Sequence, residues 1–170
     1  LSGLQNSNFP ISYTEQNNIL REYYNQINFI KDSKSDSKEN KRIHSRDFIG
    51  PSSVSLEMKN VIPLTDDINA PNINASYSVT EKADGIRKLL YINKKGKVYL
   101  INMQMEVEFT GAITENENVF NTIIDGEHVL YNKRQQYITS FLCFDIYINS
   151  GMDCRMFPLF KMEKDENNKM

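Results

Sequence analysis

The 170-residue chain has little cysteine, no long apolar run and no large excess of either charge. Two Cys are too few for a disulfide scaffold and fit a reducing compartment. No apolar stretch approaches the ~20 residues that span a bilayer, so we expect no membrane partner. Lys and Arg number 20 against 22 Asp and Glu, which argues against a strongly basic nucleic-acid-coating protein.

The composition is that of an ordinary soluble globular protein, with 39% hydrophobic and 25% charged residues. Within residues 1–30, Ser12 and Glu15 have the spacing of a capping box, with Ser12 as N-cap and Glu15 at N3. Apolar residues then recur at helical spacing. The pattern predicts one amphipathic N-terminal helix, or the end of a preceding domain. The apolar positions are Ile19, Leu20, Tyr23, Tyr24, Ile27 and Ile30.

Residues 31–46 are almost entirely polar, with mixed charges and no apolar period, which predicts a mobile linker. Its cations could touch a phosphate backbone, but a solvated loop is the simpler interpretation. Residues 161–170 form a charged tail. Between them, residues 47–160 are predicted to be one α+β domain rich in antiparallel sheet.

The prediction of a sheet rests on short runs of Val, Ile, Tyr and Phe separated by turn signals. Asn93-Lys94-Lys95-Gly96, Asn132-Lys133-Arg134 and Asn149-Ser150-Gly151 mark the turns, and Lys88–Ile101 is the clearest hairpin. The predicted strands are Tyr77–Glu81, Lys88–Ile92, Lys97–Asn102, Val107–Phe109, Thr122–Ile124, His128–Tyr131 and Tyr137–Ile148.

The residues best suited to catalysis lie in one segment between two predicted strands, Lys82-Ala83-Asp84-Gly85-Ile86-Arg87. An amine attacks only when neutral, and a nearby cation such as Arg87, partial burial or a metal ion lowers the pKa of a lysine from its usual value of about 10.4. Lys82 is therefore a candidate nucleophile. Gly85 permits a tight turn and a close approach to a nucleotide, and Asp84 holds the turn or orients the lysine. The alternative is a charged β-turn without a catalytic role.

Other reactive residues give weaker signals. His128 follows Glu127 directly, so on a strand it points to the opposite face and is expected to pack structurally. Cys143 and Cys154 lack the spacing of zinc ligands, and no Walker-type phosphate loop is present.

Three motifs in order resemble the covalent nucleotidyltransferases, the superfamily of mRNA capping guanylyltransferases and ATP-dependent polynucleotide ligases. Lys82-x-Asp84-Gly85-x-Arg87 is similar to motif I, KxDGxR. Thr122–Glu127 (TIIDGE) and Phe141–Tyr147 (FLCFDIY) resemble motifs III and IIIa. The flanking sequences, from Phe48 to about Phe160, look most like capping enzymes of large cytoplasmic DNA viruses.

The resemblance implies transfer of GMP from GTP to the 5′-diphosphate end of RNA through a lysyl-GMP intermediate on Lys82. It implies that Arg87 contacts the ribose and phosphate, and that Glu127 acts in the polar cluster around the ribose and a Mg²⁺ or Mn²⁺ ion. Phe144 would stack on the guanine. The simpler alternatives are a core position for Phe144 and an ordinary strand-end carboxylate for Glu127.

The other residues of the predicted nucleotide site are Glu81, Asp84, Gly85 and Asp145. Glu81 would help to read the base, or simply face solvent. Asp145 would lie near phosphate or metal, or cap a turn.

The resemblance also implies an ATP-grasp-like, DNA-ligase-like nucleotidyltransferase fold, here incomplete. Motifs IV to VI and an OB-fold domain would follow Phe160, so the chain alone is expected to be inactive or weak. Partners would include that domain and fused triphosphatase and methyltransferase domains, in the host cytoplasm or the virion. The alternatives are an ATP-dependent polynucleotide ligase and a catalytically silent subunit that binds RNA ends.

Overall fold

The computed structural model describes residues 2–5, 7–28, 43–52, 54–63, 71–74 and 77–159. These residues divide into two compact units. The first comprises residues 1–49 and 83–170, and the second comprises Gly50–Lys82. Most of the predicted linker and the whole charged tail lie outside the described residues.

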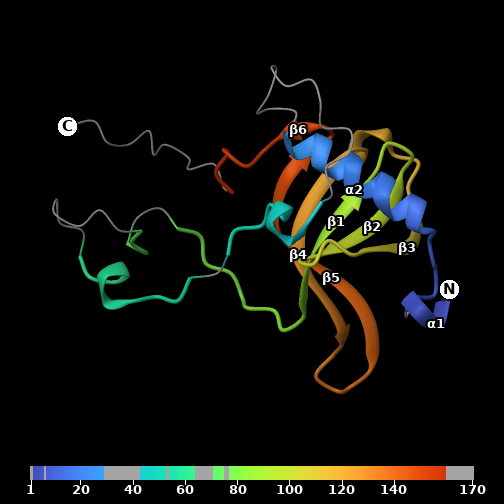
Figure 1. Ribbon diagram of the computed structural model, residues 1–170. Helices are drawn as coiled ribbons and strands as arrows, with labels where there is room; N and C mark the ends of the chain where they lie inside the picture. Colours follow the sequence, from blue (N-terminus) through green and yellow to red (C-terminus); the bar gives the residue numbers. More distant parts are fainter. Residues whose placement is uncertain are drawn as a thin grey trace. The chain divides into compact units, whose positions relative to one another are not determined.

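The first unit is built on one antiparallel sheet, which is six-stranded within the described residues and has the order β3-β2-β1-β4-β5-β6 (Figure 1). This confirms the predicted α+β class with an antiparallel sheet. The short helix α1 (Ser2–Gln5) and the helix α2 (Tyr13–Asn28) precede the sheet. The strands are β1 (Ile86–Ile92), β2 (Lys97–Asn102), β3 (Val107–Ile113), β4 (Thr122–Tyr131), β5 (Tyr137–Asn149) and β6 (Met152–Asp153), and 3₁₀ turns lie at η1 (Ser45–Asp47) and η3 (Glu117–Val119).

The predicted hairpin is present, because Tyr91 of β1 faces Tyr99 of β2 in an antiparallel register. Two other sequence predictions were wrong. Thr122–Ile124 and His128–Tyr131 belong to one continuous strand, β4, which pairs with β1 on one side and β5 on the other. Tyr77–Glu81 is not a strand, and Val79 within it is 97% exposed. Alternating apolar residues form a strand only where a neighbouring strand supplies the pairing.

Three hairpin turns share one hydrogen-bond pattern. In each, the side-chain oxygen of an Asn accepts bonds from the backbone N–H groups two and four residues later, as for Asn93 with Lys95 and Lys97 at 2.9 and 3.0 Å. Asn102 and Asn132 repeat the pattern in the β2–β3 and β4–β5 turns. This Asx geometry accounts for the asparagines of the predicted turns at Asn93 and Asn132, whereas the turn at Asn102 was not predicted.

Helix α2 supplies one side of the hydrophobic core. Ser12 caps it as predicted, since its Oγ accepts a hydrogen bond from the Glu15 N–H at 3.1 Å. The Glu15 carboxylate instead reaches β2, where it accepts bonds from Lys97 at 3.0 Å and from the Tyr99 hydroxyl at 2.8 Å. The Ser12 cap therefore ends the helix locally, and the contacts of Glu15 with Lys97 and Tyr99 fix its N-terminus to the sheet.

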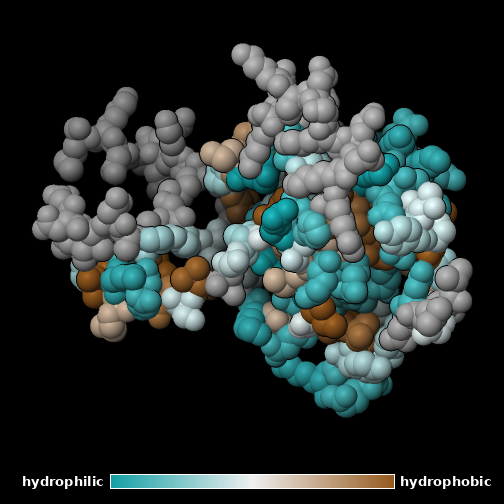
Figure 2. Space-filling view, in the orientation of Figure 1, coloured by the Kyte–Doolittle hydropathy of each residue, from teal (hydrophilic) through white to brown (hydrophobic). Residues whose placement is uncertain are grey.

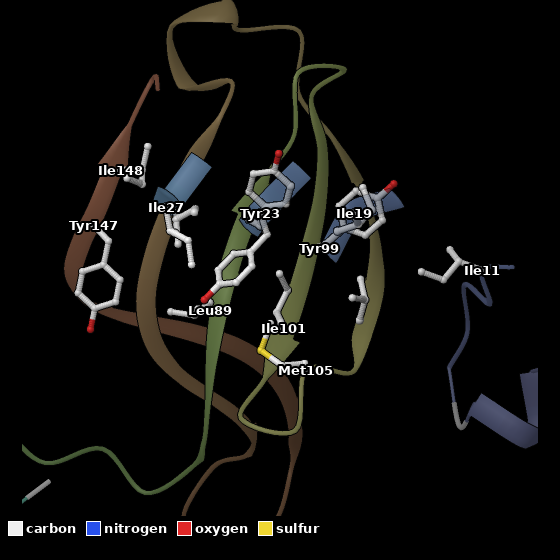
Figure 3. Packing of buried hydrophobic residues seen from close by; sticks show 13 residues of the cluster. Ile11, Ile19, Tyr23, Ile27, Leu89, Tyr99, Ile101, Met105, Tyr147 and Ile148 are labelled. Carbon is white, nitrogen blue, oxygen red and sulfur yellow. The ribbon is translucent and has the colours of Figure 1, made fainter. Parts of the chain in front are cut away.

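The core lies between α2 and one face of the sheet (Figure 3). Buried apolar side chains of the helix meet those of the central strands, and burying each such side chain stabilises the fold by roughly 1.5–3 kcal/mol. The Tyr23 hydroxyl accepts from the Ile49 N–H and donates to the Asp47 carbonyl, both at 3.0 Å, which holds the segment around η1 on the helix. The cluster includes Ile19, Tyr23, Ile27, Leu89, Tyr91, Tyr99, Ile101, Ile123, Tyr147 and Ile148.

The second unit holds the 3₁₀ turn η2 (Met58–Asn60). Buried asparagines organise it through their side-chain amides: Asn60 donates to the Pro71 carbonyl at 2.7 Å, and Asn72 donates to the Ile62 carbonyl at 2.8 Å. Across both units, none of the described helices has the length and apolar character needed to cross a membrane.

Candidate active site

The site is organised by an ion pair between Arg87 of β1 and Asp125 of β4. Arg87 Nε and Nη2 donate to the two carboxylate oxygens of Asp125 at 3.1 and 2.5 Å. The Asp125 side chain is only 1% exposed and that of Arg87 is 19% exposed. The hydrogen bond to Asp125 raises the pKa of the Arg87 guanidinium above its ordinary value, so the cation is firmly held in its charged form.

Tyr147 of β5 completes the network around Asp125. Its hydroxyl donates a hydrogen bond to Asp125 Oδ2 and lies 3.4 Å from Arg87 Nη2. Irregular pairing of β4 with β5 accompanies this placement, since Ile123 pairs with Ile148 but Ile124 pairs with Ile146. Burial, together with the hydrogen bond to Asp125, raises the pKa of Tyr147, so the hydroxyl remains a donor at neutral pH.

Two aromatic rings flank the guanidinium of Arg87. Its central carbon lies 5.6 Å from the centroid of the Phe48 ring and 5.9 Å from that of Phe144, within the range of cation–π attraction. Phe144 is 38% exposed, so it is not the core residue that its apolar strand also allowed. A half-exposed ring beside a fixed cation provides a flat surface on which a base could stack.

Carboxylates lie beside the same network. Glu127 is the register partner of Arg87, and directly opposed residues of an antiparallel pair share a face. Glu127 Oε2 is buried and has no hydrogen-bond partner among the described residues. Asp145, the register partner of Asp125, is exposed and accepts a bond from the N–H of Ile146 at 2.8 Å.

Close contacts within the sheet explain why Gly85 and Gly126, the glycines of the two motifs, lack a side chain. A Cβ on Gly85 would lie 2.8 Å from the backbone oxygen of His128, and one on Gly126 would lie 2.5 Å from that of Leu142. Gly85 was expected to permit a close approach to a nucleotide; in the structure the close approach is to β4. Asp84, beside it, is exposed.

Glu81 and Lys82 are exposed residues of the second unit, whereas Ala83 onward belongs to the first. Of the predicted site residues, the structure therefore brings together Arg87, Glu127 and Phe144 on one face of the sheet. The placement of Glu81 and Lys82 beside them remains a prediction.

Residues 12–163 match the family described as mRNA capping enzyme, catalytic domain. The chain belongs to this family.

A relative of this capping-enzyme chain is a protein of Acanthamoeba polyphaga mimivirus named "Probable mRNA-capping enzyme". The two are 26% identical over 161 residues, which is 95% of this chain and 12% of the mimivirus protein. The chain thus spans about an eighth of the length of that relative.

Three residues of the candidate site were not predicted from the sequence as site residues: Asp125, Tyr147 and Phe48. Asp125 carried a usable signal, because it stands two residues before Glu127 and strand alternation places both on one face. The contributions of Tyr147 and Phe48 depend on the irregular β4–β5 pairing and on the segment around η1, neither of which has a local sequence signature.

The described residues contain no group of three or more His, Cys, Asp or Glu side chains arranged to hold a metal ion. The buried Oε2 of Glu127, without a hydrogen-bond partner in this part of the chain, is the oxygen best suited to contribute to one. A single carboxylate suits Mg²⁺, which commonly keeps several waters and binds substrate phosphates together with one or two carboxylates.

Proposed function

We propose that this capping-enzyme chain carries the GMP-transfer site of an mRNA capping enzyme, with Lys82 as the nucleophile. It would take GMP from GTP and pass it to the 5′-diphosphate end of an RNA. The observation that carries the proposal is the fixed Arg87–Asp125–Tyr147 network, with Glu127 opposite Arg87 and Phe144 beside it.

The first step forms a bond between Lys82 Nζ and the α-phosphorus of GTP. The bond from the α-phosphorus to the oxygen bridging it to the β-phosphorus breaks, pyrophosphate leaves, and the amine proton passes to solvent. In the second step an oxygen of the RNA diphosphate end attacks the same phosphorus, the phosphorus–nitrogen bond breaks, and the released Lys82 amine takes a proton from solvent. Both steps require the α-phosphate to be held beside the amine.

Arg87 suits the holding role because its orientation is fixed before a nucleotide arrives. The Asp125 carboxylate binds its Nε and Nη2 groups, which holds the plane of the guanidinium in one orientation. A preorganised guanidinium stabilises developing phosphate charge without reorganising during the reaction. Phe144 would cover one face of the guanine, and Glu127 would bind a ribose hydroxyl or the metal.

A divalent cation, Mg²⁺ or Mn²⁺, would offset the negative charge that develops on the phosphates. Glu127 is the residue that we expect to contribute to its binding, with Asp145 as a second, exposed carboxylate nearby in the β4–β5 register.

For the protein as a whole, we propose an ATP-grasp-like, DNA-ligase-like nucleotidyltransferase fold in which further elements complete the site. An OB-fold domain, with fused triphosphatase and methyltransferase domains, would be the partner within one capping enzyme. The proposed location is the host cytoplasm or the virion.

The test is label transfer from radioactive nucleotide. The chain, and any longer polypeptide that contains it, is incubated with Mg²⁺ and GTP or ATP labelled at the α-phosphate, then separated on a denaturing gel. We expect an acid-labile label from GTP alone, and its loss in Lys82→Ala and Lys82→Arg. Lys88→Ala, six residues along, is the matched control and should keep the label.

Label from ATP instead of GTP would indicate a polynucleotide ligase. An equal label on Lys82→Ala and the wild type would contradict the assignment of the nucleophile.

A further inference from the structure

The β4–β5 hairpin extends beyond the rest of the sheet, forming an arm that we define as Val129–Ser140 (Figure 1). β1 begins at Ile86, whose register partner is His128. From Val129 to Tyr131, β4 therefore pairs with β5 alone among the described strands. An arm of two strands can contact a ligand on both of its faces.

The charge of the arm is of one sign, in a chain with a net charge of −2. Lys133 and Arg134 lie at its tip and are exposed. Neither Asp nor Glu occurs between Glu127 and Asp145, and the tip adds the amides of Asn132, Gln135 and Gln136. Figure 2 shows the corresponding hydrophilic surface at the end of the hairpin.

The tip is preorganised by hydrogen bonds. The Asn132 side-chain oxygen accepts bonds from the Arg134 and Gln136 N–H groups at 2.9 and 3.0 Å, and its amide donates to the Gln136 side chain at 2.8 Å. The two cations are therefore carried on an ordered turn, which reduces the entropic cost of binding.

Two exposed tyrosines flank the tip residues 132–136 in the sequence. Tyr131 and Tyr137 are 54% and 62% exposed, and their rings are in edge contact with centroids 5.6 Å apart. Both line an open groove of about 750 Å³, which continues past Thr139 and His128 to Lys88. The acids of this groove are already engaged: Glu108 pairs with Lys88 at 2.7 Å, and Glu106 accepts from the Asn102 amide at 2.6 Å.

We propose that this arm binds single-stranded RNA, with Lys133 and Arg134 on the phosphates and a base stacked on Tyr131 or Tyr137. Exposed aromatic rings beside cations are the combination that binds unpaired bases and their backbone together. The base of the arm meets the motif I turn, because Gly85 packs against the backbone of His128. The inference rests on the proposed function, since it assigns to the arm the RNA that accepts GMP.

The test measures binding of a fluorescent single-stranded RNA with a 5′-diphosphate end to the whole chain, by anisotropy, over a range of KCl concentrations. Lys133→Ala/Arg134→Ala should weaken binding and reduce the slope of log K against log salt by about 1.4, which is roughly 0.7 for each phosphate that is no longer neutralised. Tyr137→Ala should weaken binding about fivefold to tenfold at one salt concentration.

The β1–β2 turn provides a matched control. It has the same Asn-centred hydrogen bonds and two consecutive cations, Lys94 and Lys95, and follows the other end of β1. Lys94→Ala/Lys95→Ala should leave the affinity and slope unchanged, as should Tyr13→Ala at another exposed tyrosine. All variants are compared by thermal unfolding, and the exposed tip variant should unfold like the wild type.

An unchanged affinity and slope in both arm variants would overturn the inference and leave the arm as a surface for a protein partner. Equal weakening by the β1–β2 turn variant would also overturn it, because binding would then depend on overall charge. Label transfer from GTP to the wild type is measured in parallel. RNA binding through the arm, without label on the chain or on any longer polypeptide that contains it, would contradict the proposed function but not the binding of RNA by the arm.

Discussion

Arg87 and Lys88 are adjacent on β1, point to opposite faces of the sheet, and each pairs with an acid. Arg87 makes two hydrogen bonds to Asp125, whose side chain is 1% exposed, and Tyr147 binds the same carboxylate. Lys88 makes one contact of 2.7 Å with Glu108, whose side chain is 41% exposed. The first pair fixes a cation in one orientation, whereas the second mainly allows a lysine to lie against the sheet.

The largest expected effect comes from breaking the buried pair. Asp125→Asn removes the charge that compensates Arg87, and we expect a loss of about 3 kcal/mol in the free energy of unfolding. Urea unfolding at pH 7 measures it. Glu108→Gln is the matched control, and because the Glu108 side chain is itself 41% exposed, we expect a change within about 1 kcal/mol. Equal losses in the two variants would show that the Arg87–Asp125 and Lys88–Glu108 pairs contribute equally to the unfolding free energy.

Tyr147→Phe tests whether the Tyr147 hydroxyl, the third group of the network, stabilises the fold through its bond to Asp125. It removes one hydrogen bond to Asp125 and leaves the ring in the core, so we expect a loss of about 1 kcal/mol in unfolding free energy. Tyr13→Phe, at an exposed tyrosine, should change nothing measurable. If Tyr147→Phe equals Tyr13→Phe in urea unfolding, the hydroxyl does not contribute to holding Asp125.

Lys88→Met tests the contribution of the Lys88–Glu108 pair, on the opposite face of the sheet from Arg87. The apolar replacement keeps most of the buried stem and leaves Glu108 able to reach solvent, so the unfolding free energy should change by less than about 1 kcal/mol. A loss as large as that of Asp125→Asn, again by urea unfolding, would mean that the Lys88 pair is as important as the Arg87 pair.

The smallest effect concerns the ion pair of α2 with β2. Hydrogen bonds from Lys97 and Tyr99 lower the pKa of Glu15 in the folded protein. Glu15 therefore stabilises the fold above its unfolded pKa of about 4.3, and this contribution is lost as pH falls through the lower, folded value. Because both partners are about a third exposed, the effect should be below about 1 kcal/mol.

Unfolding free energies of the wild type and Glu15→Gln at pH 6 and pH 3 measure this contribution. The difference between the two proteins should be larger at pH 6. A larger difference at pH 3 would give the linkage the opposite sign.

Local patterns in the sequence were sufficient for the helix, its Ser12 cap and the hairpin of β1 with β2, because capping, helical spacing and Asx turns depend on nearby residues. Tyr77–Glu81 failed because a strand also needs a pairing partner distant in sequence. The central part of β4 was missed for the opposite reason: Asp125-Gly126-Glu127 has poor strand propensity, yet it is paired on both sides.

As with the fold, part of the candidate site was predicted from the sequence and part was missed. The motifs indicated Arg87, Glu127 and Phe144, which the fold brings to one face. Asp125 and Tyr147, which hold Arg87, were missed because their contacts join three strands that are distant in sequence, with an irregular β4–β5 pairing. Lys82 was selected by its motif, and its chemistry remains the central proposal.

The most direct measurement is GTP affinity in two reciprocal variants, Arg87→Lys and Lys88→Arg. Each keeps its charge, and the first loses the two-pronged bond to Asp125. We predict that Arg87→Lys weakens GTP binding at least tenfold and that Lys88→Arg leaves it within twofold of the wild type, with both proteins folded by circular dichroism. Equal GTP affinity in the two variants, or weaker binding in Lys88→Arg, would contradict the assignment of the nucleotide to the Arg87 face.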